Sequence, residues 1–327
     1  MKEGSVLGGT LLITGSCIGA GMLGLPIVTG VAGFFPSLVM FLIAWLFMTT
    51  TALLLLEALS WFNTPVNLLS IVEYTLGRIG KVVCWILYLF LFYALLVAYM
   101  STSGNHTVML SKELLSFSLS ERAATLFFIL LFGWLIYLGT RPVDHLNRAL
   151  MFGKIVSYFL LIAFGIQFVV PHLLLHFEPQ KALVSFPILI ISFGFHNMVP
   201  SLMHYMGGDK RRVRLCIVSG SLFALVIYIV WEVVALGVLP EKVIGSSYLK
   251  DIDGAEALKN YLKSPLIGFS AGGLAFFAIL TSFLANSLSL VHFLRDGFKL
   301  KKGKRENILM CLLALMPPLA FSILFPK

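Results

Sequence analysis

The stretch GSCIGAGMLGLP, Gly15–Pro26, interrupts a long apolar run near the N-terminus. It contains four glycines and ends on a proline. In a helix interior each glycine costs about 1 kcal/mol relative to alanine, and proline costs about 3 kcal/mol. The run that surrounds the stretch is long enough to cross a bilayer. The stretch therefore predicts a membrane helix that is broken near half depth.

The composition predicts a polytopic membrane protein. Of the 327 residues, 59% are hydrophobic and only 12% are charged, whereas a soluble domain has about 25% charged residues. Residues 4–56, a run of 53, contain no charged residue and no histidine, and one membrane helix needs only about 20 residues. The four cysteines form no C-x-x-C pair, so neither a disulfide framework nor a zinc site is indicated.

Nine apolar stretches have spanning length, and the turn residues and nearly all the charged residues lie between them. Backbone groups in lipid must be hydrogen-bonded within their own segment, so we expect an all-α fold. The alternating segments of about ten residues that a β-barrel requires do not occur in the sequence. The nine expected spans are 6–29, 34–57, 82–109, 123–140, 149–170, 183–206, 214–239, 266–293 and 307–325.

The distribution of basic residues predicts the orientation in the membrane. With the N-terminus in the cytoplasm, 15 of the 24 Lys and Arg residues fall in inner loops, 8 fall in outer loops, and Lys154 lies in a span. The two densest basic clusters both fall inside. They are DKRRVR (209–214) and KLKKGKR (299–305). The positive-inside rule therefore favours a cytoplasmic N-terminus. The same bias explains the net charge of +9 without a nucleic-acid partner.

A second stretch, SFGFHNMVPSL at Ser192–Leu202, interrupts the sixth span at half depth. It lies five spans after the first break, so the two broken helices cross the membrane in opposite directions. For Gly15–Pro26 alone, close helix packing through small residues is the alternative. Two broken helices in corresponding positions of inverted halves mark the substrate site of a secondary transporter. The pair therefore favours transport over packing alone.

Several motifs resemble the bacterial hydroxy/aromatic amino acid permease family, which includes the tyrosine/tryptophan-specific transport proteins of the amino acid–polyamine–organocation superfamily. Besides the two broken helices, the motifs are TALLLLE (51–57), FGKI (152–155) and TSFLANSL (281–288). The resemblance implies a leucine-transporter-like inverted-repeat fold in which helices 1 and 6 are broken. It also implies one transmembrane transporter domain over 1–327, with repeats at about 5–171 and 182–327.

The resemblance also implies about eleven spans, two more than the nine that the sequence predicts. By this comparison the second repeat lacks its last core helix, and we expect the chain to be a truncated gene product or a fragment. The resemblance implies a multi-pass protein of the bacterial inner membrane that imports tyrosine or tryptophan by proton symport. The proton is then the coupling ion, and no other cofactor is expected. A sodium-coupled symporter and a truncated, non-transporting remnant remain as alternatives.

The resemblance places the substrate's charged ends at the backbone of the two breaks. The amides of Ala20 and Gly21 would bind the carboxylate, since a helix N-terminus attracts anions. The carbonyls of Ile18, Gly19 and Phe193 would bind the ammonium group. Close packing of the helices is the alternative for these residues.

The aromatic side chain of the substrate would lie against the second break, where rings offer stacking and apolar area. Lipid contact is the alternative for the phenylalanines, a helix–helix hydrogen bond for the polar residues, and a core position for the tyrosine. The candidates are Phe193, Gly194, Phe195, His196 and Asn197, together with Tyr99 of the third span as a residue that closes over the site.

Charged residues within spans are costly and are candidates for proton coupling. Lys154 in the fifth span would replace the cation that sodium-coupled relatives hold, with Thr281 and Ser282 as hydroxyl neighbours. Snorkelling to the interface is its alternative. Glu57 would relay a proton or remain an interfacial carboxylate. Glu232 would accept a proton, or pair with a buried polar group, or stay neutral.

The sequence also excludes common classes of membrane enzyme. It contains no H-E-x-x-H metal motif and no G-x-S-x-G nucleophile motif, so the ligands or nucleophile of such chemistry are missing. We therefore expect a transporter whose partners are an aromatic amino acid, the proton and membrane lipid.

Overall fold

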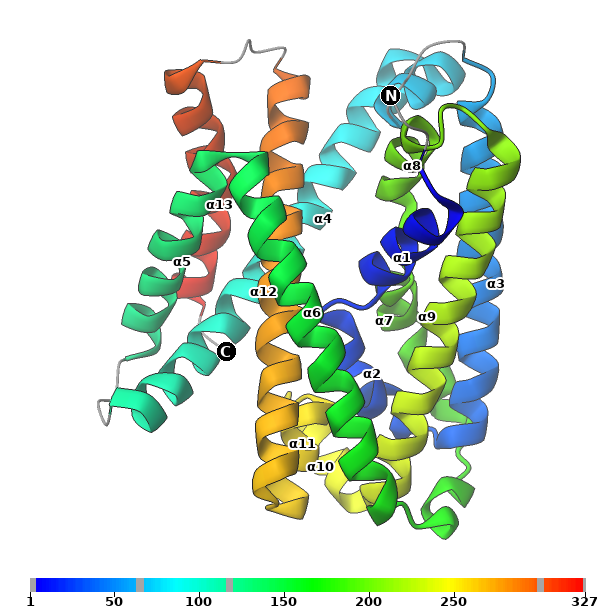
Figure 1. The fold of residues 1–327 in the computed structure, drawn as a ribbon, viewed down its shortest axis with the longest axis vertical. Coiled ribbons are helices and arrows are strands. Elements are labelled where there is room, and N and C mark those ends of the chain that lie inside the picture. Colours follow the sequence, from blue (N-terminus) through cyan, green and yellow to red (C-terminus); the bar gives the residue numbers. More distant parts are fainter. Residues whose placement is uncertain (1–3, 63–67, 116–119, 299–302, 326–327) are drawn as a thin grey trace. The chain divides into compact units, whose positions relative to one another are not determined.

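The computed structural model describes residues 4–62, 68–115, 120–298 and 303–325 (Figure 1). Every regular element in these residues is a helix, which confirms the all-α prediction. Residues 299–302, which hold most of the second basic cluster, lie outside the described part. The chain forms two units, the first from Met1–Thr75 and Ile155–Ala275 and the second from Leu76–Lys154 and Phe276–Lys327. Each unit contains segments of both expected repeats.

The first unit contains the two breaks. Helices α6 (Thr140–Gly165) and α12 (Pro265–Gly297) contribute their portions within it. Its other elements are α1 (Val6–Cys17), α2 (Gly21–Gly30), α3 (Phe34–Leu59), η1 (Ile166–Phe168), η2 (Pro171–Leu175), η3 (Pro179–Ser185), α7 (Phe186–Ser192), η4 (His196–Met198), α8 (Val199–Tyr205), α9 (Lys210–Val238), α10 (Glu241–Leu249) and α11 (Gly254–Leu262).

The second unit is built from α4 (Leu68–Leu115), α5 (Glu121–Leu138), α13 (Lys304–Leu324) and the remaining parts of α6 and α12. Helix α4 is longer than the predicted span 82–109, and it kinks at Gly77, which has a φ of 69°. Glycine adopts such a φ without the steric cost of a Cβ atom. Within this unit all five helices contribute to one apolar core, in which the rings of Phe128 and Phe283 meet edge to face at 5.0 Å.

The helices reproduce the expected spans. Seven are long and apolar enough to cross a membrane, and α1 and α2, bent by 57°, together make an eighth candidate. The remaining predicted span, 123–140, corresponds to the shorter apolar helix Arg122–Leu138. The described chain is therefore a multi-pass membrane protein.

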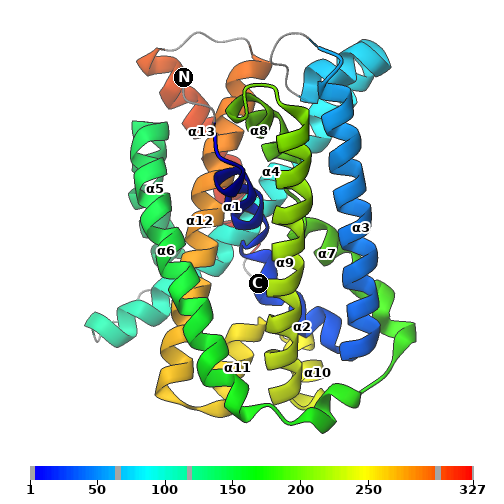
Figure 2. The ribbon, with the colours of Figure 1, turned by 45° about the vertical axis from the view of Figure 1, so that its right-hand side comes forward.

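Helix α9 is the central support of the first unit, and it runs beside α1 (Figure 2). Gly220 allows this approach, because a Cβ atom there would lie 2.6 Å from Ile13 Cβ and 2.8 Å from the Thr10 carbonyl oxygen. The Thr14 hydroxyl is 3.0 Å from the Gly220 carbonyl oxygen and joins the two backbones. Small residues and hydroxyl groups at such contacts are what hold helices together in a membrane. Helix α9 thereby fixes the half-helix that leads into the first break.

Candidate substrate and ion-coupling sites

The first break lies where the glycine pattern predicts it. Helix α1 ends at Cys17 and α2 begins at Gly21. The Gly19 amide turns back to the Cys17 carbonyl at 2.7 Å, and the Met22 amide bonds to the Gly19 carbonyl at 3.2 Å. The chain thus leaves the α-helical hydrogen-bonding pattern in a tight turn and then starts a second half-helix. Gly21 supplies the first amide of that half-helix, where the helix dipole favours an anion.

The second break follows α7, which ends at Ser192. The Phe195 amide bonds to the Phe193 carbonyl at 3.0 Å, and the Met198 amide bonds to the Phe195 carbonyl at 2.9 Å. Pro200 lies in the first turn of α8, where a missing amide hydrogen is tolerated. The predicted interruption of the sixth span is therefore present.

One tyrosine links the two breaks. The Tyr228 hydroxyl of α9 lies 2.6 Å from the carbonyl oxygen of Cys17 and 2.8 Å from that of Ser192. Each carbonyl belongs to the last residue of a half-helix, so it accepts no bond from a continuing helix, and that of Cys17 also accepts from the Gly19 amide. The Tyr228 side chain is fully buried. The hydroxyl has one proton, so it shares a single donor between the two carbonyls and joins both helix ends.

The two breaks also approach each other directly. A Cβ atom on Gly21 would lie 2.9 Å from Ser192 Oγ. Ser192 Oγ is buried, and within the described residues it has no hydrogen-bond partner. The start of α2 and the end of α7 are thus neighbours, with an unsatisfied hydroxyl group between them. The structure brings together the backbone of both motifs, as the sequence predicts.

The side chains of the second break pack within the first unit. Phe193 and Phe195 are fully buried. The ring of Phe193 meets Tyr228 edge to face at 5.1 Å, and Phe195 stacks on His196 at 5.4 Å. His196 Nε2 lies 2.9 Å from Thr51 Oγ1 of α3. This is the helix–helix hydrogen bond that the sequence analysis gives as the alternative role for this histidine.

Two further candidates at this break, Gly194 and Asn197, are exposed. At the first break Ile18 is buried and Ala20 is half-buried. The assignment of these residues to substrate contact stays a prediction.

Lys154 is buried in the second unit. Its side chain is 1% exposed, and Nζ donates to Thr281 Oγ1 at 3.4 Å. Thr281 in turn donates to the Ala278 carbonyl at 3.1 Å, so its hydroxyl oxygen faces the ammonium group as an acceptor. The lysine therefore does not snorkel, and the predicted lysine–threonine pair is present.

Tyr99 and Ser282 also belong to the second unit, and their side chains share a hydrogen bond. Tyr99 is half-buried and packs against the apolar core of the unit. Tyr99 therefore occupies a core position, which is the alternative given for it above. Its closure over a substrate stays a prediction. Glu57, near the end of α3, is exposed, as an interfacial carboxylate would be.

Glu232 is the buried carboxyl group of the first unit. It is 1% exposed, and its Oε2 lies 2.9 Å from Thr29 Oγ1. The Thr29 hydroxyl also lies 2.8 Å from the Leu25 carbonyl oxygen, which can only accept. A hydroxyl has one proton, so when Thr29 donates to Leu25, Glu232 must be the donor in the second bond. The arrangement accommodates an ionised Glu232 that accepts from Thr29 and a protonated Glu232 that donates to it. Oε1 of Glu232 has no partner within the described residues.

Two residues of these sites were not predicted, Tyr228 and Thr29. On α9, Tyr228, Trp231 and Glu232 occupy positions i, i+3 and i+4, which share one helix face. The Trp231 indole donates to the Met22 carbonyl at 3.0 Å, so this face lies against α2. The spacing is visible in the sequence and would have grouped Tyr228 with Glu232.

An all-helical membrane chain with two adjacent broken helices defines a secondary-transporter fold. The crystal structure of MhsT in complex with L-phenylalanine matches it with a TM-score of 0.68, at 15% identity, over 99% of this chain and 81% of that one. This likeness confirms the leucine-transporter-like fold. The model of the tryptophan/tyrosine permease family matches residues 2–327. The chain belongs to this family.

Individual relatives agree with this assignment. The tryptophan-specific transport protein of Haemophilus influenzae is 32% identical over 99% of this chain and 81% of its own length. The tyrosine-specific transport system 1 of the same organism is 29% identical over 98% of this chain and 81% of its own length. The low affinity tryptophan permease of Escherichia coli (strain K12) is 28% identical over 100% of this chain and 81% of its own length. The protein is thus a transport protein and not an enzyme, as the sequence predicts.

Proposed function

We propose that the protein imports tryptophan or tyrosine by proton symport across the bacterial inner membrane, with its N-terminus in the cytoplasm. The observation that carries the proposal is the pair of breaks joined by Tyr228. Membership of the permease family supports transport, and the names of the relatives support an aromatic amino acid as substrate. The excess of basic residues in the expected inner loops supports the orientation.

The breaks suit recognition of an amino acid by the backbone. All amino acids share a carboxylate and an ammonium group, and unwound turns offer amides to the first and carbonyls to the second. Gly21 would present its amide at the positive end of α2. The Ser192 hydroxyl, which has no partner in the described residues, would give a further polar contact. The substrate ring would then select aromatic amino acids by area burial and stacking.

Two buried ionisable groups support a proton as the coupling ion. The hydrogen bonds of Glu232 accommodate its protonated form as well as its ionised form, and deprotonation leaves a buried charge without an ion-pair partner, which is costly. Lys154 places an ammonium group beside Thr281 where a sodium ion would be repelled. We therefore favour proton coupling over sodium coupling.

The test is uptake by purified protein in liposomes. Saturable accumulation of labelled tryptophan or tyrosine is expected when the outside is made acidic, in sodium-free buffer, and unlabelled aromatic amino acids should compete. Absence of saturable uptake would contradict transport by this chain. Uptake that requires sodium at fixed pH would instead support the sodium-coupled alternative.

A further inference from the structure

Three segments of the first unit meet at one end of α3. They are the α2–α3 turn, the link between η2 and η3, and the start of α10. The Glu178 amide bonds to the Ala32 carbonyl at 2.8 Å. Gly33 has a φ of +91°, and a Cβ atom there would come within 2.0 Å of the His176 carbonyl oxygen. The backbone that carries His176 and Glu178 is thus fixed against α2 and α3.

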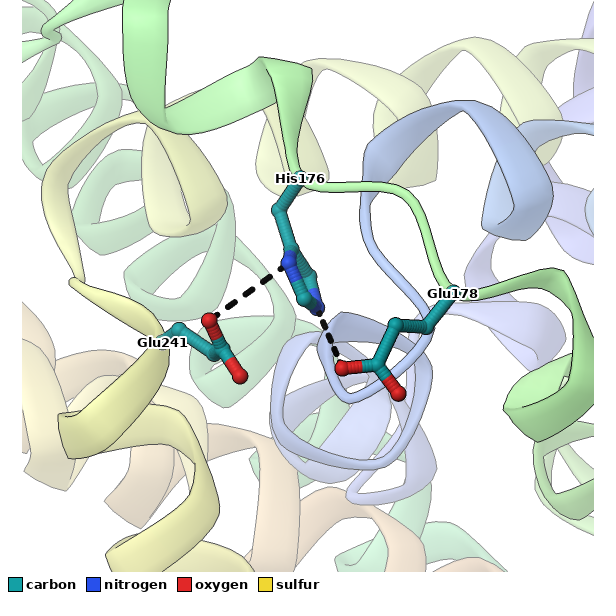
Figure 3. A group of neighbouring side chains, drawn as sticks. All are labelled: His176, Glu178 and Glu241. Atoms are coloured by element: carbon teal, nitrogen blue, oxygen red, sulfur yellow. Dashed lines mark ion pairs between the residues drawn. The ribbon is translucent and has the colours of Figure 1, made fainter.

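The imidazole of His176 lies between two carboxylates, one from its own segment and one from α10 (Figure 3). His176 Nδ1 is 3.6 Å from Glu241 Oε2, and Nε2 is 3.9 Å from Glu178 Oε1. One ligand atom from each of the three residues can be chosen so that all lie within 4.8 Å of one another. His176 Nε2 is buried and has no hydrogen-bond partner within the described residues.

These separations are too long for hydrogen bonds, and each is close to the spacing between two ligands of one ion. With metal–ligand distances of about 2.1 Å, two ligand atoms of a tetrahedral ion are about 3.4 Å apart. A single ion binds only one nitrogen of an imidazole. With Nε2 as that nitrogen, its distance of 3.9 Å to Glu178 Oε1 lies just above this value, and Glu241 supplies an oxygen within 4.8 Å of the other ligand atoms. The Glu241 side chain is 62% exposed, so it is free to move the remaining distance.

Lys181 forms an ion pair with only one oxygen of the Glu178 carboxylate. Lys181 Nζ lies 2.6 Å from Glu178 Oε2, so this ion pair orients the carboxylate and leaves Oε1 directed at the imidazole. The two carboxylates together carry one more unit of negative charge than Lys181 neutralises. The group thus offers an imidazole nitrogen and a net negative field.

We propose that His176, Glu178 and Glu241 form a binding site for a divalent transition-metal ion, with Zn²⁺ as the probe that fits best. An imidazole and two carboxylates are typical ligands of Zn²⁺, and water completes the coordination where the group is exposed. Calcium prefers six to eight oxygen ligands, more than this group supplies. The bound ion joins the η2–η3 link to α10 and, through Ala32 and Gly33, stabilises their contact with the α2–α3 turn. Binding is independent of the proposed transport activity.

Calorimetric titration of ZnCl₂ into the detergent-solubilised protein, purified without a polyhistidine tag, tests the proposal. We expect one site per chain, and an affinity that falls at least about tenfold in His176→Ala, as for the loss of a ligand contact. Glu241→Gln, on an exposed side chain, should weaken binding in the same way if His176→Ala fails to fold. His172→Ala is the matched control, because His172 is an exposed histidine of η2, and it should bind Zn²⁺ as the unmodified protein does.

Three results would overturn the proposal. They are no stoichiometric Zn²⁺ binding to the unmodified protein, equal binding by His176→Ala or Glu241→Gln, and equal loss of binding in His172→Ala. Calcium chloride in place of ZnCl₂ should give no stoichiometric binding, and equal calcium affinity would refute the transition-metal assignment.

Discussion

The Tyr228 hydroxyl lies within 2.8 Å of the Ser192 carbonyl oxygen and also bonds to the carbonyl of the residue that ends α1. One side chain of an unbroken helix thus holds both broken helices at their interruptions. Both carbonyls are buried and end their helices. The Cys17 carbonyl also accepts from the Gly19 amide, so the Ser192 carbonyl depends more on this donor. The relationship makes α9 the element that positions the candidate substrate site.

Removal of this donor tests its role. Tyr228→Phe keeps the ring that packs on Phe193 but removes the donor that the buried Ser192 and Cys17 carbonyls share, which we expect to cost about 1–3 kcal/mol of stability. Substrate affinity should fall as well, because the unwound turns are less well ordered. Thermal unfolding and tryptophan or tyrosine binding, measured on the same preparation, check both effects. Unchanged stability and affinity would show that Tyr228 does not support the breaks.

The contact between α1 and α9 depends on Gly220, which has no side chain. Gly220→Ala places a methyl group 2.6 Å from Ile13 Cβ, and such overpacking typically costs about 1–3 kcal/mol. Gly272→Ala in α12 is the control, because a Cβ atom there meets nothing within 4 Å. It should be neutral or stabilise by up to about 1 kcal/mol. Equal melting temperatures for the two variants would refute the packing argument.

Glu232 should control the coupling of transport to protons. Glu232→Gln keeps the shape, and its amide can donate to Thr29 Oγ1 as the protonated acid does, so the fold should remain stable. It cannot release a proton. We expect exchange of internal for external tyrosine to continue while accumulation driven by a pH gradient is lost. Full gradient-driven accumulation by Glu232→Gln would exclude Glu232 as a proton carrier.

Lys154 should matter through its charge. Lys154→Met retains a long apolar stem but removes the ammonium group that faces Thr281. We expect proton-driven accumulation to be lost while the protein still folds, since an apolar residue replaces a costly buried charge. Uptake with and without an imposed pH gradient measures the effect. A Lys154→Met variant that still concentrates substrate would remove this residue from coupling.

Much of the fold is predictable because the bilayer imposes strong rules on the sequence. The uncharged run 4–56, the loop charges and the two glycine-containing breaks together predict the helices and both interruptions. Lys154 and Thr281 were also paired correctly, because the family resemblance assigns them to neighbouring positions. Sodium or proton coupling, by contrast, depends on protonation states that no residue pattern specifies.

The contacts that join distant segments were not predictable in the same way. Thr29 and Glu232 are 203 residues apart, and nothing in the local sequence of Thr29 distinguishes it from other threonines in spans. His176 lies in an irregular segment, and Glu241 begins a helix 65 residues later. The backbone of His176 lies against the turn at Gly33, which has a φ of +91°. Pattern reasoning has no access to such contacts.

In the proposed function the protein moves an aromatic amino acid together with a proton. The most direct measurement uses sealed liposomes that contain the protein and an internal pH-sensitive dye, in sodium-free buffer without an imposed pH gradient. Addition of tyrosine or tryptophan to the outside should acidify the interior, and Glu232→Gln should abolish that signal. Substrate entry without any acidification of the interior would contradict proton symport.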